Sequence, residues 1–290
     1  MPTTDSMNLS DIKQIEALLK RHGFRFSKSL GQNFLVNPEV CPAMAEAAVS
    51  DASCGVLEIG PGIGVLTKEL AKRAAKVVSV ELDRRLFPIL EETLAPFNNV
   101  KLVEGDILKL DLHALLKEEF PDMPIVVCAN LPYYITSPVI TKLLQEQLPL
   151  RSVTVMVQAE AADRLCAEMG TREAGAITAA VQYYAQVEEL FPVSKESFVP
   201  APKVTSKVIQ LTLLPEPVIP VENEQAFFAM VKAGFTQRRK TILNSLSSGL
   251  HLGKEPLRQI LKELHIPETA RIEQLSLEDL IHIYQAAAKK

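Results

Sequence analysis

Residues 55–64 read Gly-Val-Leu-Glu-Ile-Gly-Pro-Gly-Ile-Gly and decide the fold of this 290-residue chain. A short apolar run leads into a loop with glycines at alternate positions, and residues 65–74 continue with a helical pattern. A strand, a glycine loop and a helix in this order are typical of a parallel βαβ unit. Because glycine has no Cβ atom, such a loop lets the main chain approach a ligand closely.

Further runs of short, β-branched and apolar residues follow the first one. They lie at residues 76–81, 100–106, 125–130 and 152–158. Helical patterns such as residues 136–147 lie between them, and strands that alternate with helices form parallel βαβ units. Two later strands, near residues 183–190 and 207–214, complete the sheet as a hairpin-like edge. We therefore expect a Rossmann-like α/β sheet that helices cover on both faces.

A proline-rich stretch separates this sheet from the rest of the chain. Residues 214–220 read LPEPVIP, and every pattern after them is helical. We therefore predict two domains: residues 1–215, an N-terminal extension with the Rossmann-like domain, and residues 216–290, a small all-helical domain. The extension begins with a predicted helix over residues 10–21, which Ser10 would cap.

The composition excludes several classes of protein. With 47% hydrophobic and 23% charged residues, the chain resembles an ordinary globular protein. Its net charge of −4 excludes a uniformly basic nucleic-acid binder but leaves room for a local basic face. The cysteines form no C-x-x-C pair, so we expect neither a disulfide framework nor a metal site. The sequence shows no signal peptide and no apolar span free of prolines, so we expect a cytoplasmic protein without a membrane partner.

Acidic residues at strand ends predict the cofactor. Glu81 closes the second strand and can accept hydrogen bonds from ribose hydroxyls, while Asp106 ends the third and can accept one from an adenine amine. The spacing from Gly60 is G-x-G-x-G rather than the G-x-G-x-x-G of NAD sites, and Glu58 would repel a pyrophosphate. The pattern favours S-adenosylmethionine over NAD. The simpler interpretation is that the acids only cap turns.

The tetrapeptide Asn130-Leu131-Pro132-Tyr133 directly follows the fourth strand and predicts the chemistry. An adenine amine is a poor nucleophile, because its lone pair is delocalised into the ring. The Asn130 side chain and a main-chain carbonyl, that of Leu131, can each accept one of its N–H bonds and so free the lone pair. Tyr133 can stack on a base taken out of its helix. The alternative is an ordinary strand-to-helix turn with a solvated asparagine and a packed tyrosine.

Aromatic and basic residues elsewhere point to a nucleic acid. Residues 20–34 carry four positive charges and no acid, and Phe198 opens a segment that offers a second aromatic ring to the target base. In the helical domain, Arg238, Arg239 and Lys240 form a basic run that can hold phosphates. The simpler interpretation of this run is a solvated helix face.

Taken in order, these motifs resemble one family. They are residues 30–35, 57–64, 80–83, 105–106, 130–134, 198–204 and 235–246. The chain resembles the ribosomal RNA adenine N6-dimethyltransferases, and within them the bacterial type that modifies small-subunit 16S rRNA. The resemblance implies a class I methyltransferase fold and S-adenosylmethionine as methyl donor, with S-adenosylhomocysteine as product. It also implies two adjacent adenosines near the 3′ end of 16S rRNA, each dimethylated, within an immature small subunit.

The resemblance also implies roles for individual residues. Those implied to line the cofactor site are Asn33, Leu35, Gly60, Glu81, Asp106 and Asn130. Those implied to hold the adenine are Asn130, Leu131 and Tyr133, with Phe198 stacking. One departure is Thr205 before Ser206, where the family usually has an acid, and it leaves the local loop geometry open. We expect a monomer.

Two other functions remain as alternatives. One is the related methyltransferase that acts on a large-subunit adenine and confers macrolide resistance. Leu30-Gly31 before Gln32, and Leu131 in the tetrapeptide, favour the small-subunit type. The other is a non-catalytic RNA-binding assembly factor, which the intact tetrapeptide at residues 130–133 argues against.

Overall fold

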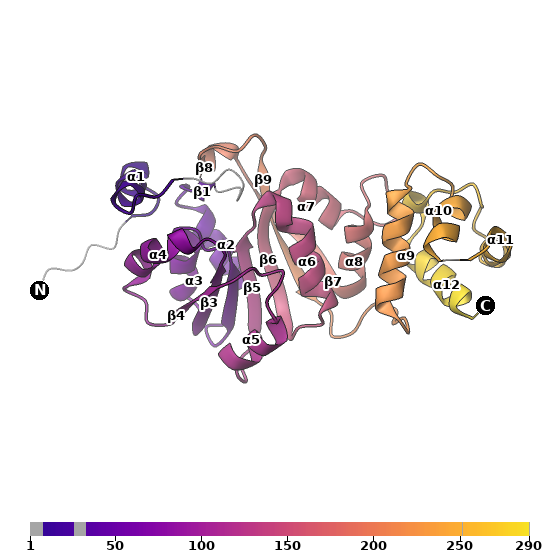
Figure 1. The fold of residues 1–290 in the computed structure, drawn as a ribbon, viewed down its shortest axis with the longest axis horizontal. Coiled ribbons are helices and arrows are strands. Elements are labelled where there is room, and N and C mark those ends of the chain that lie inside the picture. Colours follow the sequence, from indigo (N-terminus) through magenta and orange to yellow (C-terminus); the bar gives the residue numbers. More distant parts are fainter. Residues whose placement is uncertain (1–7, 26–32, 251, 290) are drawn as a thin grey trace, which may run out of the picture. The chain divides into compact units, whose positions relative to one another are not determined.

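Figure 1 shows the fold of the chain in a computed structural model, which describes residues 8–25, 33–250 and 252–289. The chain divides into two compact units, one of Met1–Ala162 and Glu188–Leu213, the other of Asp163–Val187 and Leu214–Lys290. The boundary predicted at residue 215 differs from this division, because it leaves residues 163–187 with the first domain. Aromatic packing accounts for the difference, since Tyr183 lies edge-on to Phe228 with ring centroids 5.3 Å apart.

A seven-stranded sheet forms the centre of the first unit (Figure 1). Its strand order is β4 (Val100–Glu104), β3 (Lys76–Glu81), β2 (Gly55–Ile59), β5 (Ile125–Asn130), β6 (Leu150–Gln158), β9 (Ser206–Leu213) and β7 (Ala185–Val193). The first five strands in this order pair in parallel, and β9 pairs antiparallel with β6. The predicted Rossmann-like sheet is confirmed, and the two late strands lie together at its edge. The strand order reverses between β2 and β5, the position at which open α/β sheets bind ligands.

Helices pack on this sheet because its strands are apolar on both faces. The helices before β6 are α1 (Ile12–Arg21), α2 (Val40–Ala48), α3 (Val65–Ala71), α4 (Phe87–Leu94), α5 (Leu112–Glu119) and α6 (Thr136–Gln145). Every residue of β2 is buried, as the unbroken apolar run predicts. Met44 of α2 and Leu70 of α3 belong to one buried cluster with Val56 of β2, so α2 and α3 cover the same face.

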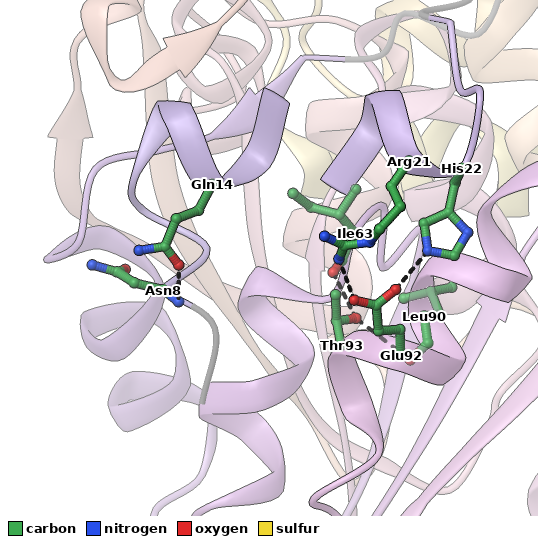
Figure 2. A network of polar contacts seen from close by, with 8 residues as sticks. All are labelled: Asn8, Gln14, Arg21, His22, Ile63, Leu90, Glu92 and Thr93. Carbon is green, nitrogen blue, oxygen red and sulfur yellow. Dashed lines mark hydrogen bonds and ion pairs between the residues drawn. The ribbon is translucent and has the colours of Figure 1, made fainter. Parts of the chain in front are cut away.

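The N-terminal helix α1 packs against α4 and the glycine loop. Leu18 and Ile15 share a buried cluster with Leu90 of α4 and with Ile63 of the loop. At the edge of this contact, Arg21 and His22 both bond to the carboxylate of Glu92, as Figure 2 shows. The helix begins at Ile12, and its cap is Asp11 rather than the predicted Ser10. Asp11 accepts a hydrogen bond from the main-chain N–H of Lys13, 2.9 Å away, which stabilises the first turn.

The second unit is helical. Its helices are α8 (Ala176–Tyr184), α9 (Glu224–Thr236), α10 (Ile242–Gly249), α11 (Lys254–Glu263) and α12 (Leu277–Ala288), and α7 (Ala159–Cys166) contains the boundary between the units. Ser276 and Asp279 cap α12 reciprocally, with hydrogen bonds of 2.9 and 3.0 Å. Among the residues that the structure describes, no helix is long and apolar enough to cross a bilayer.

Candidate active site

A cavity of about 270 Å³ opens in the first unit, at the carboxyl ends of the parallel strands. Nine residues that sequence motifs predict as site residues line this one cavity. They are Asn33, Leu35, Gly60, Glu81, Asp106, Asn130, Leu131, Tyr133 and Phe198. The ends of β2, β3 and β5 and the loop after β4 each contribute, because parallel strands all deliver their carboxyl ends to the same edge.

The glycine loop follows β2 and ends where α3 begins. Gly60, Gly62 and Gly64 have φ angles of 71°, 60° and 90°, a region that side chains with a Cβ atom rarely adopt. The loop is held from behind, since the Thr93 hydroxyl of α4 donates to the main-chain carbonyl of Ile63 at 3.0 Å. The loop therefore presents main chain to the cavity in a fixed conformation.

Two carboxylates lie at the cavity wall next to this loop. Glu81 is 7% exposed and accepts a hydrogen bond of 2.8 Å from the main-chain N–H of Asp83. Burial raises the pKa of Glu81, and hydrogen bonds from main-chain N–H groups oppose that rise. Asp106 accepts a hydrogen bond of 3.0 Å from the N–H of Leu108 and also lines the cavity. Each acid thus caps a turn and faces the cavity at once.

Glu58 lies in β2 and is not among the described residues that line the cavity, so the expectation that it repels a pyrophosphate in this site has no support here. Its side chain is 1% exposed, and Oε2 accepts a hydrogen bond of 2.6 Å from the Ser79 hydroxyl of β3. Among the described residues, Oε1 has no partner. Burial raises the pKa of Glu58 to about 7, although the bond from Ser79 opposes the rise. The carboxyl is therefore a costly buried group under the loop.

The tetrapeptide at the end of β5 forms the opposite side of the cavity. Asn130 is the last residue of β5, and the N–H of Leu131 still donates to the Met156 carbonyl of β6 at 3.2 Å. Tyr133 begins a single 3-10 turn, and its hydroxyl lies 3.0 Å from Oγ of Ser206. Among the residues that the structure describes, none bonds to the Asn130 side chain. Its amide is therefore available to a ligand.

A two-stranded ribbon brings a further pair of expected residues together. Strand β1 (Phe34–Leu35) pairs antiparallel with β8 (Phe198–Val199), and Leu35 lies opposite Phe198. Residues from distant parts of the sequence thus meet at the cavity. Residues 26–32, which include Leu30, Gly31 and Gln32 of the predicted motif, lie outside the described residues.

Sequence reasoning missed Ser206 and Tyr134. Tyr134 lines the cavity and is 56% exposed, and although the motif at residues 130–134 includes it, the sequence analysis gives it no role. Ser206 lies 73 residues from Tyr133 in the chain, and only the pairing of β9 with β6 brings it near. The aromatic character of Tyr134 beside the tetrapeptide was a usable signal, whereas nothing local indicates the contact of Ser206.

Comparison with known proteins shows the family to which this chain belongs. The family model described as ribosomal RNA adenine dimethylase matches residues 23–289. The chain belongs to the ribosomal RNA adenine dimethylase family. It is 45% identical to the ribosomal RNA small subunit methyltransferase A of Alkaliphilus oremlandii, over 97% of this chain and 99% of that protein. It is 47% identical to the protein of the same name from Bacillus mycoides, over 93% and 94%.

Solved structures of methyltransferases are similar to this chain. A dimethyladenosine transferase from Plasmodium falciparum has 25% identity and a TM-score of 0.74, covering 88% of this chain and 98% of that one. The 23S rRNA methyltransferase ErmE has 26% identity and a TM-score of 0.66, covering 88% and 100%. The Rossmann-like methyltransferase fold is therefore confirmed.

The basic run Arg238-Arg239-Lys240 lies in the second unit, and its three members differ. Arg238 bonds to the carboxylate of Glu273 and to the main-chain carbonyl of Arg172, so it links parts of this unit. Arg239 and Lys240 are exposed. The two exposed cations are thus better placed to meet an external phosphate than Arg238 is.

Proposed function

We propose that this chain transfers methyl groups from S-adenosylmethionine to N6 of two adjacent adenosines in a hairpin near the 3′ end of 16S rRNA. The observation that carries the proposal is the meeting of nine expected residues at one cavity. The higher identity to relatives named for the small subunit than to the 23S rRNA methyltransferase supports the choice of 16S rRNA.

The wall formed by the glycine loop fits the cofactor. Main chain without Cβ atoms at Gly60 and Gly62 leaves room for a close approach, and two carboxylates face the same space. Glu81 would accept hydrogen bonds from the ribose hydroxyls, and Asp106 one from the adenine amine. Asn33 and Leu35 would complete this wall. When bound, S-adenosylmethionine supplies an electrophilic methyl group on its sulfonium sulfur.

The wall formed by the tetrapeptide would hold the target adenine. The Asn130 side-chain oxygen and the Leu131 carbonyl would each accept one N6–H bond, which frees the lone pair of the nitrogen for attack. Tyr133 and Phe198 would stack on the base and fix its plane. Catalysis then depends mainly on positioning. The methylated amine is acidic and loses its proton afterwards, so no side chain is needed as a general base.

Exposed cations of the second unit would hold the RNA outside the cavity. We assign this role to Arg239 and Lys240, with Arg238 supporting the local structure through Glu273. Replacing Arg239 and Lys240 with alanine should weaken RNA binding and reduce the slope of log affinity against log salt by about 2. Replacing exposed Lys117 of α5 is the control and should leave that slope unchanged. Equal slopes for all proteins would contradict the assignment.

The proposal extends to the substrate and its setting. We propose that the chain acts as a monomer on an immature small subunit in the cytoplasm, where the hairpin is still accessible. The test is transfer of labelled methyl groups from S-adenosylmethionine to undermodified small subunits and, separately, to large subunits, followed by mass spectrometry of the rRNA. We expect dimethyladenosine at two adjacent positions of 16S rRNA only. Label in 23S rRNA would support the large-subunit alternative, and no label would support a binding factor.

A further inference from the structure

Ser206 is a fully buried hydroxyl that contacts the candidate active site. It is the first residue of β9 and is 0% exposed. Its Oγ lies 3.0 Å from the hydroxyl of Tyr133, and either atom can donate. A buried hydroxyl without a partner is costly, and among the described residues the bond to Tyr133 is the one that satisfies the Ser206 side chain.

The sheet holds Ser206 in a fixed place relative to Asn130. Ser206 lies opposite Gln158 in the antiparallel pairing of β9 with β6, and Asn130 lies opposite Met156 in the parallel pairing of β5 with β6. One strand, β6, therefore positions both residues at the same sheet edge. The Ser206 hydroxyl is anchored to the frame that also carries Asn130.

Tyr133 is not part of a sheet strand that would fix its position in the same way. It lies in a single 3-10 turn, Tyr133–Ile135, after Pro132, and no residue of that turn is buried. Stacking on a flat base requires a ring whose plane is defined, and a half-buried tyrosine on a short turn can adopt more than one rotamer. A hydrogen bond at the tip of the ring removes most of this freedom.

We propose that Ser206 is a positioning residue for methyl transfer, because its hydroxyl fixes the ring of Tyr133 against which the target adenine stacks. This inference rests on the proposed function of Tyr133. Ser206 acts through the tyrosine hydroxyl alone, so removing either hydroxyl has the same consequence. Turnover falls by about 10-fold, the loss expected from one hydrogen bond that orders a reacting group. Cofactor affinity does not change, because neither hydroxyl belongs to the wall formed by the glycine loop.

A double-mutant cycle tests this inference with Ser206→Ala, Tyr133→Phe and the two combined. The measurements are kcat and KM on small subunits, and the dissociation constant of S-adenosylhomocysteine by calorimetry. We expect each single variant to lose about 10-fold in kcat, the double variant to lose no more, and cofactor affinity to stay within about 2-fold. Thr205→Ala removes an exposed neighbouring hydroxyl and serves as the matched control.

Three results would overturn the inference. Losses that multiply in the double variant would show that the hydroxyls act independently. A fully active Ser206→Ala protein would show that Tyr133 needs no anchor. A parallel loss of cofactor affinity would show a merely structural role for Ser206. By contrast, an unaltered chain that methylates no subunit would overturn the proposed function itself, and this inference with it.

Discussion

The two walls of the cavity are built from different parts of the chain. The cofactor wall, defined as Asn33, Leu35, residues 60–64, Glu81 and Asp106, includes a glycine loop whose main-chain conformation is set by positive φ angles. The target wall, defined as Asn130, Leu131, Tyr133 and Phe198, would offer three side chains and one main-chain carbonyl to the base, and the Tyr133 hydroxyl contacts a residue far along the chain. Backbone changes should therefore affect cofactor affinity, and side-chain changes should affect turnover.

The largest expected effect is on the target wall. Asn130→Ala removes an acceptor of the adenine amine, so we expect kcat to fall between about 100-fold and 1,000-fold, as when a preorganised polar contact is lost. Cofactor affinity should be retained at least in part, because Glu81, Asp106 and the glycine loop are unchanged, although the family resemblance also implies a place for Asn130 beside the cofactor. Steady-state methylation and calorimetry separate the two quantities. Asn98→Ala, at an exposed asparagine, is the control. Equal turnover of Asn130→Ala and the unaltered chain would exclude the proposed role of Asn130.

The next effect concerns the acid behind the cofactor wall. Burial raises the pKa of Glu58 from 4.5 to about 7, so the folded chain binds more protons than the unfolded chain between these values. The stability due to unaltered Glu58 therefore falls as pH rises from 5 to 8. Glu58→Gln keeps a partner for Ser79 without the charge. We expect this variant to be more stable than the unaltered chain at pH 8, by on the order of 3 kcal/mol, and similar at pH 5.

Urea unfolding at several pH values measures this difference. Glu16→Gln, at an exposed glutamate of α1, should show no such pH dependence relative to the unaltered chain. A Glu58→Gln stability difference that is constant from pH 5 to pH 8 would mean that Glu58 titrates alike in the folded and unfolded chain. Burial of Glu58 would then not lower the stability of the folded chain at high pH.

A backbone change in the cofactor wall should have a smaller effect. Gly64 has a φ of 90°, and an added Cβ atom would lie 3.1 Å from Oγ1 of Thr93 and from a methyl group of Leu94. Gly64→Ala should therefore cost about 1–2 kcal/mol of stability and lower cofactor affinity by about 10-fold. Gly175→Ala is a matched control, since Gly175 has a φ of −144° and open space around it. If Gly64→Ala and the unaltered chain bind the cofactor with equal affinity, the conformation of the loop at Gly64 does not determine cofactor binding.

The contrast between the walls also explains what the sequence could predict. The parallel strands, the glycine loop and the acids at strand ends depend on local patterns, and the structure has them within a few residues of where the sequence places them. The strand expected near residues 183–190 begins later, at Ala185, because Tyr183 and Tyr184 end α8. The sequence predicts Tyr133 as the ring that stacks on the base, but it does not predict the contact with Ser206, because the register of β9 on β6 sets that contact. Arg238 was grouped with Arg239, because charge alone does not show which cation has an internal carboxylate.

The smallest expected effect concerns the helix behind the cofactor wall. Glu92 of α4 accepts bonds from His22 and Arg21 (Figure 2). Its side chain is 37% exposed. The bond from His22, followed by that from Arg21, lowers the pKa of Glu92. The stability due to these bonds is therefore present above the ordinary pKa of a glutamate and is lost as pH falls through the lowered value. Because the group is exposed and screened, we expect Glu92→Gln to cost less than about 1 kcal/mol at pH 7.

Urea unfolding at pH 7, in low and high salt, measures the cost of Glu92→Gln. Glu91→Gln, at the neighbouring exposed glutamate, is the control and should cost nothing measurable. Apolar packing holds α1 against α4 and Ile63. Leu18 of α1, for example, is fully buried in this contact. Cofactor affinity should therefore be unchanged in Glu92→Gln. A loss of several-fold in that affinity would mean that the ion pairs, and not the apolar contact, support the glycine loop from behind.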